Sequence, residues 1–268
     1  MRGILLAALL LGPAAAHSSD ASVPAARRQP KAKTAARPAA VAVSTAAAGA
    51  ELPTYAASTE TLTLDLIAAR FAELDGKMNA LRADFGQFVR MEGSDTVQEV
   101  SGEVEFKKPD LMRLTHKIPE SQIVVSDGAW LWVYRPSTNQ VIKTRLEDWR
   151  KREPLAKGLL DFGRSADLLK RYAASISTVS APGADGYRTF EVSLRPKPED
   201  RTSADADFTL TLKASTKDFF PYEAALRVGR ASIRSTFTRV RLNPEFSDDP
   251  FRFTPPAGAD VFDSPSQP

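Results

Sequence analysis

Alternating apolar and polar positions run through the middle of the chain and predict a series of β-strands. Between Val100 and Lys107 every second residue is apolar or glycine, and the residues between them are serine, glutamate or lysine. This is the period of a strand with one buried face and one solvated face. The turn dipeptide Asp127-Gly128 favours a tight hairpin, so we expect an antiparallel meander. Further strands are predicted at Leu111–His116, Ile123–Val125, Trp130–Tyr134, Asn139–Thr144, Ala173–Val179, Tyr187–Leu194, Phe208–Leu212, Tyr222–Val228 and Ile233–Leu242.

One of these strands, Trp130–Tyr134, is apolar on both faces. Both faces must therefore be covered, either by a helix on one side or by curling of the sheet into a barrel.

An amphipathic helix precedes the strands. Its apolar residues are spaced by three and four positions, which places them on one helical face. Thr61 is the expected N-cap and Asp65 lies in the first turn, whereas Gly76 weakens the helix by about 1 kcal/mol relative to alanine. Such a helix cannot bury its stripe alone, so we expect it to lie on the sheet. The stripe consists of Leu64, Ile67, Phe71, Leu74, Met78 and Leu81.

A helical insertion is predicted midway through the strands, over Glu153–Lys170. Pro154 is a good first helical residue, and Ser165 is the expected cap of a second short helical turn. The insertion carries an apolar stripe of Leu155, Leu159 and Phe162, with Leu160 beside it.

These elements predict an α+β, mainly β fold: a curled antiparallel sheet of about ten or eleven strands with one long helix. The space between sheet and helices is either filled by side chains or an open apolar cavity. Filled cores are the commoner arrangement, so the residues alone favour a filled interior.

The N-terminal residues are typical of a targeting segment. Arg2 precedes the apolar run Ile4–Leu11 and the small residues Ala14–Ala16, which predicts a signal peptide at residues 1–16. The apolar run is too short to span a bilayer. No cysteine follows it, so we expect an exported, soluble protein without a lipid anchor.

Residues 17–59 are rich in alanine, proline, serine and basic side chains. Such a segment has too little apolar surface to order itself, which predicts a disordered linker before a domain at residues 60–268. A basic arm that contacts a membrane surface is the alternative. The overall charge of +3 arises here, and the remainder of the chain is about neutral. Nothing in that remainder indicates a nucleic-acid partner.

Features of enzymes are missing from the sequence. The chain has no cysteine and two histidines, His17 and His116, which is too few for a zinc cluster. It has no Gly-x-Ser-x-Gly elbow and no phosphate-cradling glycine loop. Glu103 and Glu105 lie two apart on one strand and more simply belong to a solvated face. We expect no enzymatic activity, no metal and no cofactor.

Several segments resemble the LolA family of periplasmic lipoprotein carriers, from about residue 60 to 262 and in the family's order. They include a Phe-x-Gln strand after the first helix, a Gly-led strand that ends in Lys-Lys-Pro, and a Val-Ser-Asp-Gly hairpin followed by Leu-Trp and Tyr. The last of the matching segments is a Phe-x-Phe-x-Pro-Pro-x-Gly ending near the C-terminus. The matching segments are Ala83–Phe88, Gly102–Pro109, Val125–Pro136, Pro154–Leu160 and Phe251–Gly258.

The resemblance implies an incomplete, half-open antiparallel β-barrel of about 11 strands, with a long N-terminal helix and short lid helices. It also implies an interior open to acyl chains, against the filled interior favoured above. Lys108 stands where the family has an arginine that closes the lid, and it lacks the planar fork of that arginine. The implied lipid-binding residues are Ile67, Phe71, Met112, Leu114, Val124, Leu131, Val133, Leu155, Leu159 and Leu160.

The resulting functional hypothesis is a monomeric periplasmic chaperone that carries acylated lipoproteins from the inner to the outer membrane. Its expected partners are an inner-membrane ABC-type lipoprotein-releasing complex and an outer-membrane receptor. A lipid- or lipoprotein-sensing regulatory module with a related half-barrel is the alternative, and a lipid hydrolase is disfavoured by the missing nucleophile and base.

Overall fold

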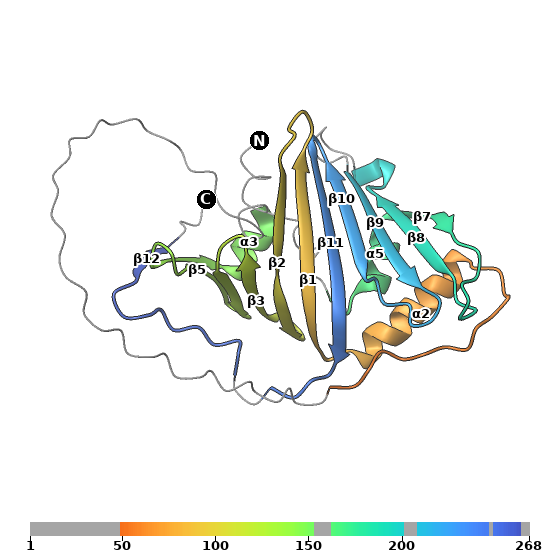
Figure 1. The fold of residues 1–268 in the computed structure, drawn as a ribbon, viewed down its shortest axis with the longest axis horizontal. Helices are drawn as coiled ribbons and strands as arrows, with labels where there is room; N and C mark the ends of the chain where they lie inside the picture. The colour runs from red at the N-terminus through yellow and green to blue at the C-terminus, as the bar shows by residue number, and fades with distance from the viewer. Residues whose placement is uncertain (1–48, 153–161, 201–207, 247–248, 264–268) are drawn as a thin grey trace.

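The computed structural model describes residues 49–152, 162–200, 208–246 and 249–263. Their strands form one twelve-stranded sheet in the order β12-β6-β5-β4-β3-β2-β1-β11-β10-β9-β8-β7. The sheet is curled but not closed (Figure 1). Its strands are β1 Ala80–Met91, β2 Val97–Lys107, β3 Leu111–Ile118, β4 Gln122–Asp127, β5 Trp130–Arg135, β6 Gln140–Arg145, β7 Ala173–Val179, β8 Thr189–Arg195, β9 Phe208–Ser215, β10 Glu223–Val228, β11 Ala231–Leu242 and β12 Asp260–Asp263.

The predicted fold class is confirmed, with one strand more than expected. The additional strand, β12, pairs parallel to β6, whereas the other neighbours in the sheet pair antiparallel. The sequence did not predict β12 because it is only four residues long and exposed throughout, so it lacks an alternating pattern.

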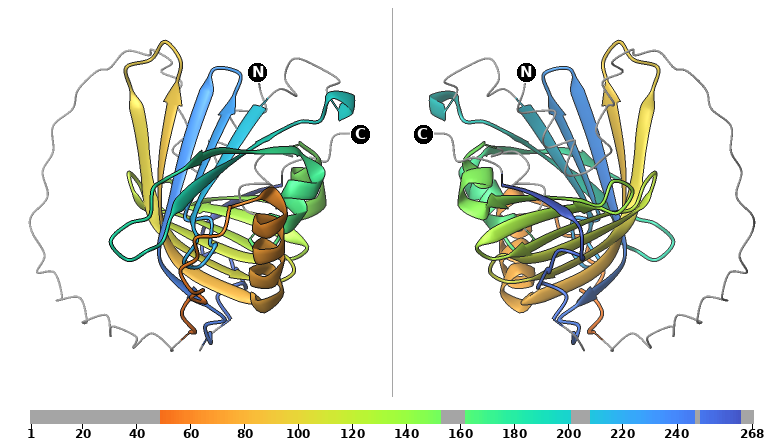
Figure 2. Two further views of the ribbon diagram at one scale, coloured as in Figure 1. Left: turned by 90° about the vertical axis from the view of Figure 1, so that its right-hand side faces the viewer. Right: turned by 90° about the vertical axis from the view of Figure 1, so that its left-hand side faces the viewer.

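Helices of the described segments pack on one side of the sheet (Figure 2). They are α2 Leu64–Lys77, α3 Leu146–Arg152 and α5 Ser165–Arg171, and a single 3-10 turn, η1, spans Pro198–Asp200. The sequence missed α3, which begins directly after β6. The helix expected to start at Pro154 lies outside the described residues.

Helix α2 starts later and ends earlier than predicted. Thr63, not Thr61, is the N-cap, and its Oγ1 accepts a hydrogen bond from the amide of Leu66 at 3.2 Å. The helix ends at Lys77 with Met78 as the C-cap, so Leu81 lies in β1, where it is fully buried. The apolar spacing continued past the helix because the first residues of β1 face the same core.

Strand β2 has the register that its pattern predicts. Val100 and Val104 are fully buried, and Gly102 lies between them. A Cβ atom at Gly102 would lie 2.1 Å from the carbonyl oxygen of Thr115 on β3. Glycine is therefore required where these two strands approach most closely.

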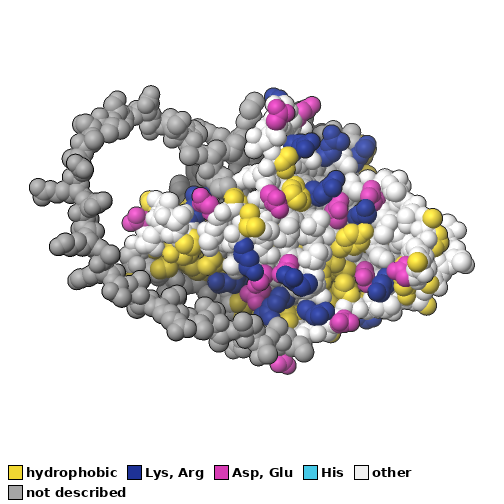
Figure 3. Space-filling view, viewed as in Figure 1, with side chains coloured by type: hydrophobic (Ala, Val, Ile, Leu, Met, Phe, Trp, Pro, Cys, Tyr) yellow, Lys and Arg dark blue, Asp and Glu magenta, His cyan; other side chains and the backbone are white. Residues whose placement is uncertain are grey.

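The opposite face of β2 is solvated and charged, as predicted for Glu103 and Glu105. Glu105 accepts from Arg82 of β1 at 2.7 Å, and Glu103 accepts from Lys117 of β3 at 2.6 Å. Each glutamate thus pairs with a neighbouring strand and not with the other glutamate. Figure 3 shows acidic and basic side chains interspersed over this side of the sheet.

The outer face of β5 is covered by the C-terminal segment. The ring of Phe253 packs against Trp132 and Tyr134, with centroids 5.7 and 5.9 Å apart. The Nζ atom of Lys143 lies 3.9 Å from the centroid of Trp130. The strand is therefore apolar on both faces because its inner face meets the core under α3, and its outer face meets this returning segment.

Residues 49–59 correct the predicted linker boundary. Ala50 and Leu242 exchange two backbone hydrogen bonds of 2.8 Å. The ring of Tyr55 packs edge-on against Phe219, with centroids 5.4 Å apart, and the Arg70 guanidinium lies 4.3 Å from its centroid. This part of the expected linker contacts the domain because Leu52 and Tyr55 supply apolar surface. The predicted signal peptide and the rest of the linker lie outside the described residues.

Candidate functional site

The inner face of β3, β4 and β5 carries five of the predicted lipid-binding residues in one buried group, which we call the β3–β5 cluster. None of these five side chains is more than 6 % exposed. Leu146 and Trp149 of α3 cover them from the other side. The five are Met112, Leu114, Val124, Leu131 and Val133.

The other two described residues of the predicted set lie elsewhere. Ile67 and Phe71 of α2 are fully buried against the inner faces of β8, β9 and β10, in a second group that we call the β8–β10 cluster. The prediction treated the set as one surface, but the curl of the sheet divides it into two. The three lid residues Leu155, Leu159 and Leu160 lie outside the described residues.

Phe162 lies where the two halves of the interior meet. Its ring contacts Phe106 of β2 and Phe237 of β11, with centroids 5.7 and 5.3 Å apart. It packs both on the β3–β5 cluster and on a junction cluster around Leu74, Met78 and Phe106. Phe162 is half-buried, and it lines a small cavity on each side.

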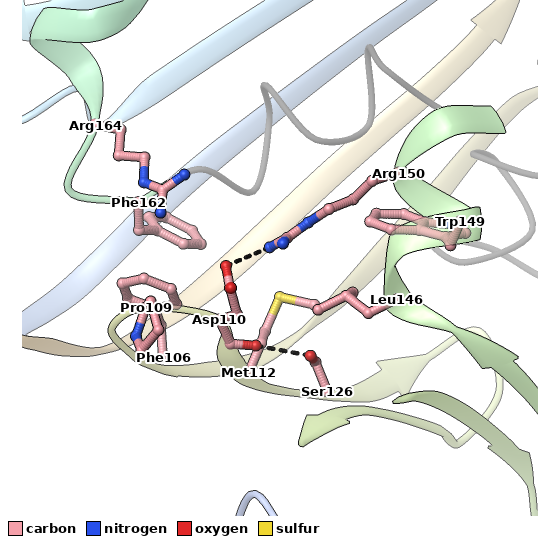
Figure 4. A pocket seen from close by; sticks show the side chains of 10 residues that line it. All are labelled: Phe106, Pro109, Asp110, Met112, Ser126, Leu146, Trp149, Arg150, Phe162 and Arg164. Atoms are coloured by element: carbon pink, nitrogen blue, oxygen red, sulfur yellow. Dashed lines mark hydrogen bonds and ion pairs between the residues drawn. The ribbon is translucent and has the colours of Figure 1, made fainter. Parts of the chain in front are cut away.

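The first cavity has a volume of about 30 Å³ and opens between α3 and Phe162 (Figure 4). Its walls are mostly apolar, and three charged side chains stand among them. The lining residues are Phe106, Pro109, Asp110, Met112, Ser126, Leu146, Trp149, Arg150, Phe162 and Arg164.

The second cavity, of about 40 Å³, lies between α2, α5 and strands β9 to β11. It is lined by Leu74, Met78, Phe162, Gly163, Ser165, Leu168, Leu212, Phe220, Pro221, Ala224 and Phe237. Each cavity is large enough for about one water molecule. Among the described residues, three clusters of buried apolar side chains occupy the inner face around these cavities.

Lys108 joins three segments at the end of β2. Its Nζ atom donates to the carbonyl oxygen of Asp75, in the last turn of α2, at 2.5 Å. A cation is favourable there because the carbonyl groups at a helix C-terminus carry partial negative charge. Gly163 lies against the same side chain: a Cβ atom at Gly163 would be 2.7 Å from Lys108 Cε, and its φ is +72°. Only glycine fits this position without strain.

Asp75 fastens α5 to α2. Its Oδ2 atom accepts from the amide of Ala166 at 2.8 Å and so caps α5, whose own N-cap residue, Arg164, makes no side-chain cap bond. The sequence predicted Ser165 as the cap, but Ser165 is the first helical residue. Burial raises the pKa of the Asp75 carboxyl, although the hydrogen bonds from the α5 amides oppose that shift.

His116 is buried on the inner face of β3. Burial lowers the pKa of its imidazole to about 4, so the ring is neutral near pH 7. It packs edge-on against Phe85, with centroids 5.6 Å apart. In the described part of the chain, no group of three or more His, Asp or Glu side chains could hold a metal ion.

Sequence reasoning missed Trp149 and Asp75. Leu146 and Trp149 lie three residues apart, which is helical spacing, but a pair is too short a signal to define a helix. The role of Asp75 depends on the approach of α5, about 90 residues further along the chain, and no local pattern reports it. None of the helices in the described ranges has the length and apolarity needed to cross a bilayer.

A family profile and two similar relatives point to the same family. A family profile described as outer membrane lipoprotein carrier protein LolA matches residues 76–254. An outer-membrane lipoprotein carrier protein of Xanthomonas campestris pv. campestris is 32% identical over 193 residues, which cover 70% of this chain and 86% of that protein.

The carrier protein of Albidiferax ferrireducens is 29% identical over 188 residues, covering 69% of this chain and 84% of that protein. Among solved structures, a LolA superfamily protein from Nitrosomonas europaea has a TM-score of 0.38 and 15% identity, covering 72% of this chain and 99% of that chain.

Proposed function

Because this chain belongs to the LolA family of outer membrane lipoprotein carriers, we propose that it shields the acyl chains of lipoproteins between the two membranes. The acyl chains bind on the inner face of the sheet, over the β3–β5 cluster. The observation that carries this proposal is Phe162, a half-buried ring between two small cavities of the apolar interior.

Acyl chains replace Phe162 and join the two cavities. Each methylene removed from water contributes about 0.8 kcal/mol, so a chain of about fifteen methylenes supplies roughly 12 kcal/mol. Displacing a half-buried phenylalanine costs about 2 kcal/mol, half of the usual range for a buried one. Burial of the acyl chain outweighs displacement of the ring, so the loaded protein is favoured over an empty protein with the acyl chain exposed to water. The mainly apolar walls bind through nonpolar contacts and not through specific polar bonds, so the chain can leave when another apolar environment is offered.

Lys108 and Asp75 keep α5 docked on α2 while lipid enters. Both bonds involve groups away from the β3–β5 cluster, so this junction stays intact as the cluster opens. Leu155, Leu159 and Leu160 complete the cover in this proposal, as the family resemblance implies. The carrier acts in the periplasm as a monomer, receives lipoproteins from an inner-membrane ABC-type complex and delivers them to an outer-membrane receptor.

The proposal is tested by depleting the protein and separating the inner and outer membranes. We expect acylated lipoproteins to accumulate in the inner membrane and to return to the outer membrane on re-expression. An unchanged distribution would contradict carriage.

Purification from cells followed by mass spectrometry of the bound material separates the alternatives. An intact acylated polypeptide supports a carrier. A bound signalling protein without acyl chains would indicate a regulatory module, and a cleaved lipid would indicate a hydrolase.

A further inference from the structure

Polar groups surround the first cavity in an arrangement that its apolar walls do not explain. The Arg150 guanidinium of α3 pairs with the Asp110 carboxylate, and the Ser126 hydroxyl donates to the Asp110 carbonyl oxygen at 2.7 Å. Figure 4 shows Arg164 on the opposite side of the cavity, so that two guanidinium groups flank it. Among the charged side chains of this rim, two arginines can donate hydrogen bonds and only Asp110 can accept them.

The Arg164 guanidinium is free to bind a ligand. Within the described ranges, its side chain has no hydrogen bond or ion pair, and it does not cap the helix that it precedes. A guanidinium carries five N–H donors and no acceptor. Arg164 lies between Phe162 and α5 along the chain, and these two flanking parts keep it beside the cavity.

Trp149 provides a second unused donor on the facing wall. The side chain is 4 % exposed, and its Nε1 atom is buried without a hydrogen-bond partner in the described part of the chain. Trp132 shows the usual arrangement: its Nε1 atom donates to Asp127 Oδ2 at 3.1 Å. A buried donor without an acceptor is costly, and proteins retain few of them.

Both groups can only donate, so a ligand held between them would supply oxygen acceptors. The cavity of about 30 Å³ has room for one or a few such atoms. Phe106, Met112, Leu146 and Phe162 continue from it as an apolar wall. An oxygen atom at the head of a hydrocarbon chain matches this combination of donors and apolar surface.

We propose that Trp149 and Arg164 bind the ester carbonyl oxygens that join acyl chains to their glyceryl head, and so fix where the chains enter the interior. This inference rests on the proposed function, because it places the head of the same ligand. Chain length then varies freely at the far end, while the carbonyl groups set the depth and direction of insertion.

The test compares a dipalmitoyl glycerol with its dihexadecyl ether analogue, which has the same chains without ester carbonyls. Palmitate serves as a third ligand with a free carboxylate. Each displaces a fluorescent fatty-acyl probe from the purified protein. We expect the unsubstituted protein to prefer the ester over the ether by about tenfold or more, since two hydrogen bonds are gained.

Trp149→Phe keeps an aromatic ring and removes the indole donor. It should weaken binding of the ester more than binding of the ether, and so lower the ester-over-ether preference by about 3–10-fold. Arg164→Gln should lower the preference by about tenfold. Trp132→Phe on the outer face and Arg171→Gln at the exposed end of α5 are the matched controls and should leave the preference unchanged.

Equal binding of ester and ether by the unsubstituted protein would overturn the inference, as would equal loss of both lipids in Trp149→Phe and Arg164→Gln. A preference confined to palmitate would assign the site to a carboxylate and overturn the ester assignment. Failure of all three ligands to displace the probe would instead contradict the proposed function. If Trp149→Phe does not fold, as judged by circular dichroism, the half-exposed Arg164 variant decides the matter.

Discussion

Replacing Phe162 with alanine should open the interior of the empty protein. The ring is the shared wall of both cavities and contacts Phe106 and Phe237. Removing it joins cavities of about 30 and 40 Å³ into one larger space. A fully buried Phe→Ala change costs about 3–5 kcal/mol. Because Phe162 is only half-buried, we expect a loss of about 2 kcal/mol in the free energy of unfolding.

Two measurements check this prediction. Urea unfolding reports the free energy, and the fluorescence of a hydrophobic dye without added lipid reports access to the interior. We expect Phe162→Ala to bind dye where the unsubstituted protein does not, with its strands retained by circular dichroism. Phe162→Leu, which keeps most of the apolar bulk, should fall between the two.

Phe88→Ala is the matched control. Phe88 lies on the outer face of β1 and is 42 % exposed, so the same substitution removes surface that already meets water. It should change stability by less than about 0.5 kcal/mol and leave dye binding unchanged. If the two alanine variants behave alike, or if Phe162→Ala loses stability without gaining dye binding, Phe162 is not the wall that closes the interior.

Three further outcomes are expected. Asp75→Ala should lose the α5 cap and about 1 kcal/mol in the free energy of unfolding, measured with urea. Asp75→Asn keeps an acceptor and, because burial raises the carboxyl pKa, should lose less at pH 7. Equal losses in the two variants would show that the negative charge is required. Tyr55→Ala should lower the thermal midpoint because it removes the contacts with Phe219 and Arg70, and truncation before residue 49 should not; the reverse result would show that residues 49–59 do not anchor the domain. Since burial lowers the His116 pKa from 6.5 to about 4, stability should fall as the pH drops from about 6.5 towards 4, by about 3 kcal/mol in total; a His116→Gln variant with the same pH profile would exclude this histidine as the cause.

Local pattern was enough to predict most of the strands, the amphipathic helix and their assembly into a curled sheet, although β12 and α3 were missed. Strand β2 illustrates the reason: alternation between Val100 and Phe106 depends only on which side of one strand meets the core. The stripe of α2 is equally local, and so Ile67 and Phe71 were correctly placed on its buried face. The resemblance to LolA identified the family, because its motifs are short segments that can be recognised one at a time.

How these surfaces combine depends on contacts between distant parts of the folded chain. Ile67 and Met112 look equivalent in sequence, but the curl of the sheet places them in different clusters with Phe162 between. The boundary of the linker, the cap that Asp75 supplies to α5 and the unused donors of Trp149 and Arg164 all depend on residues distant in the chain. A periodic pattern reports that a side chain is buried, but it contains no information on which distant side chain it will meet.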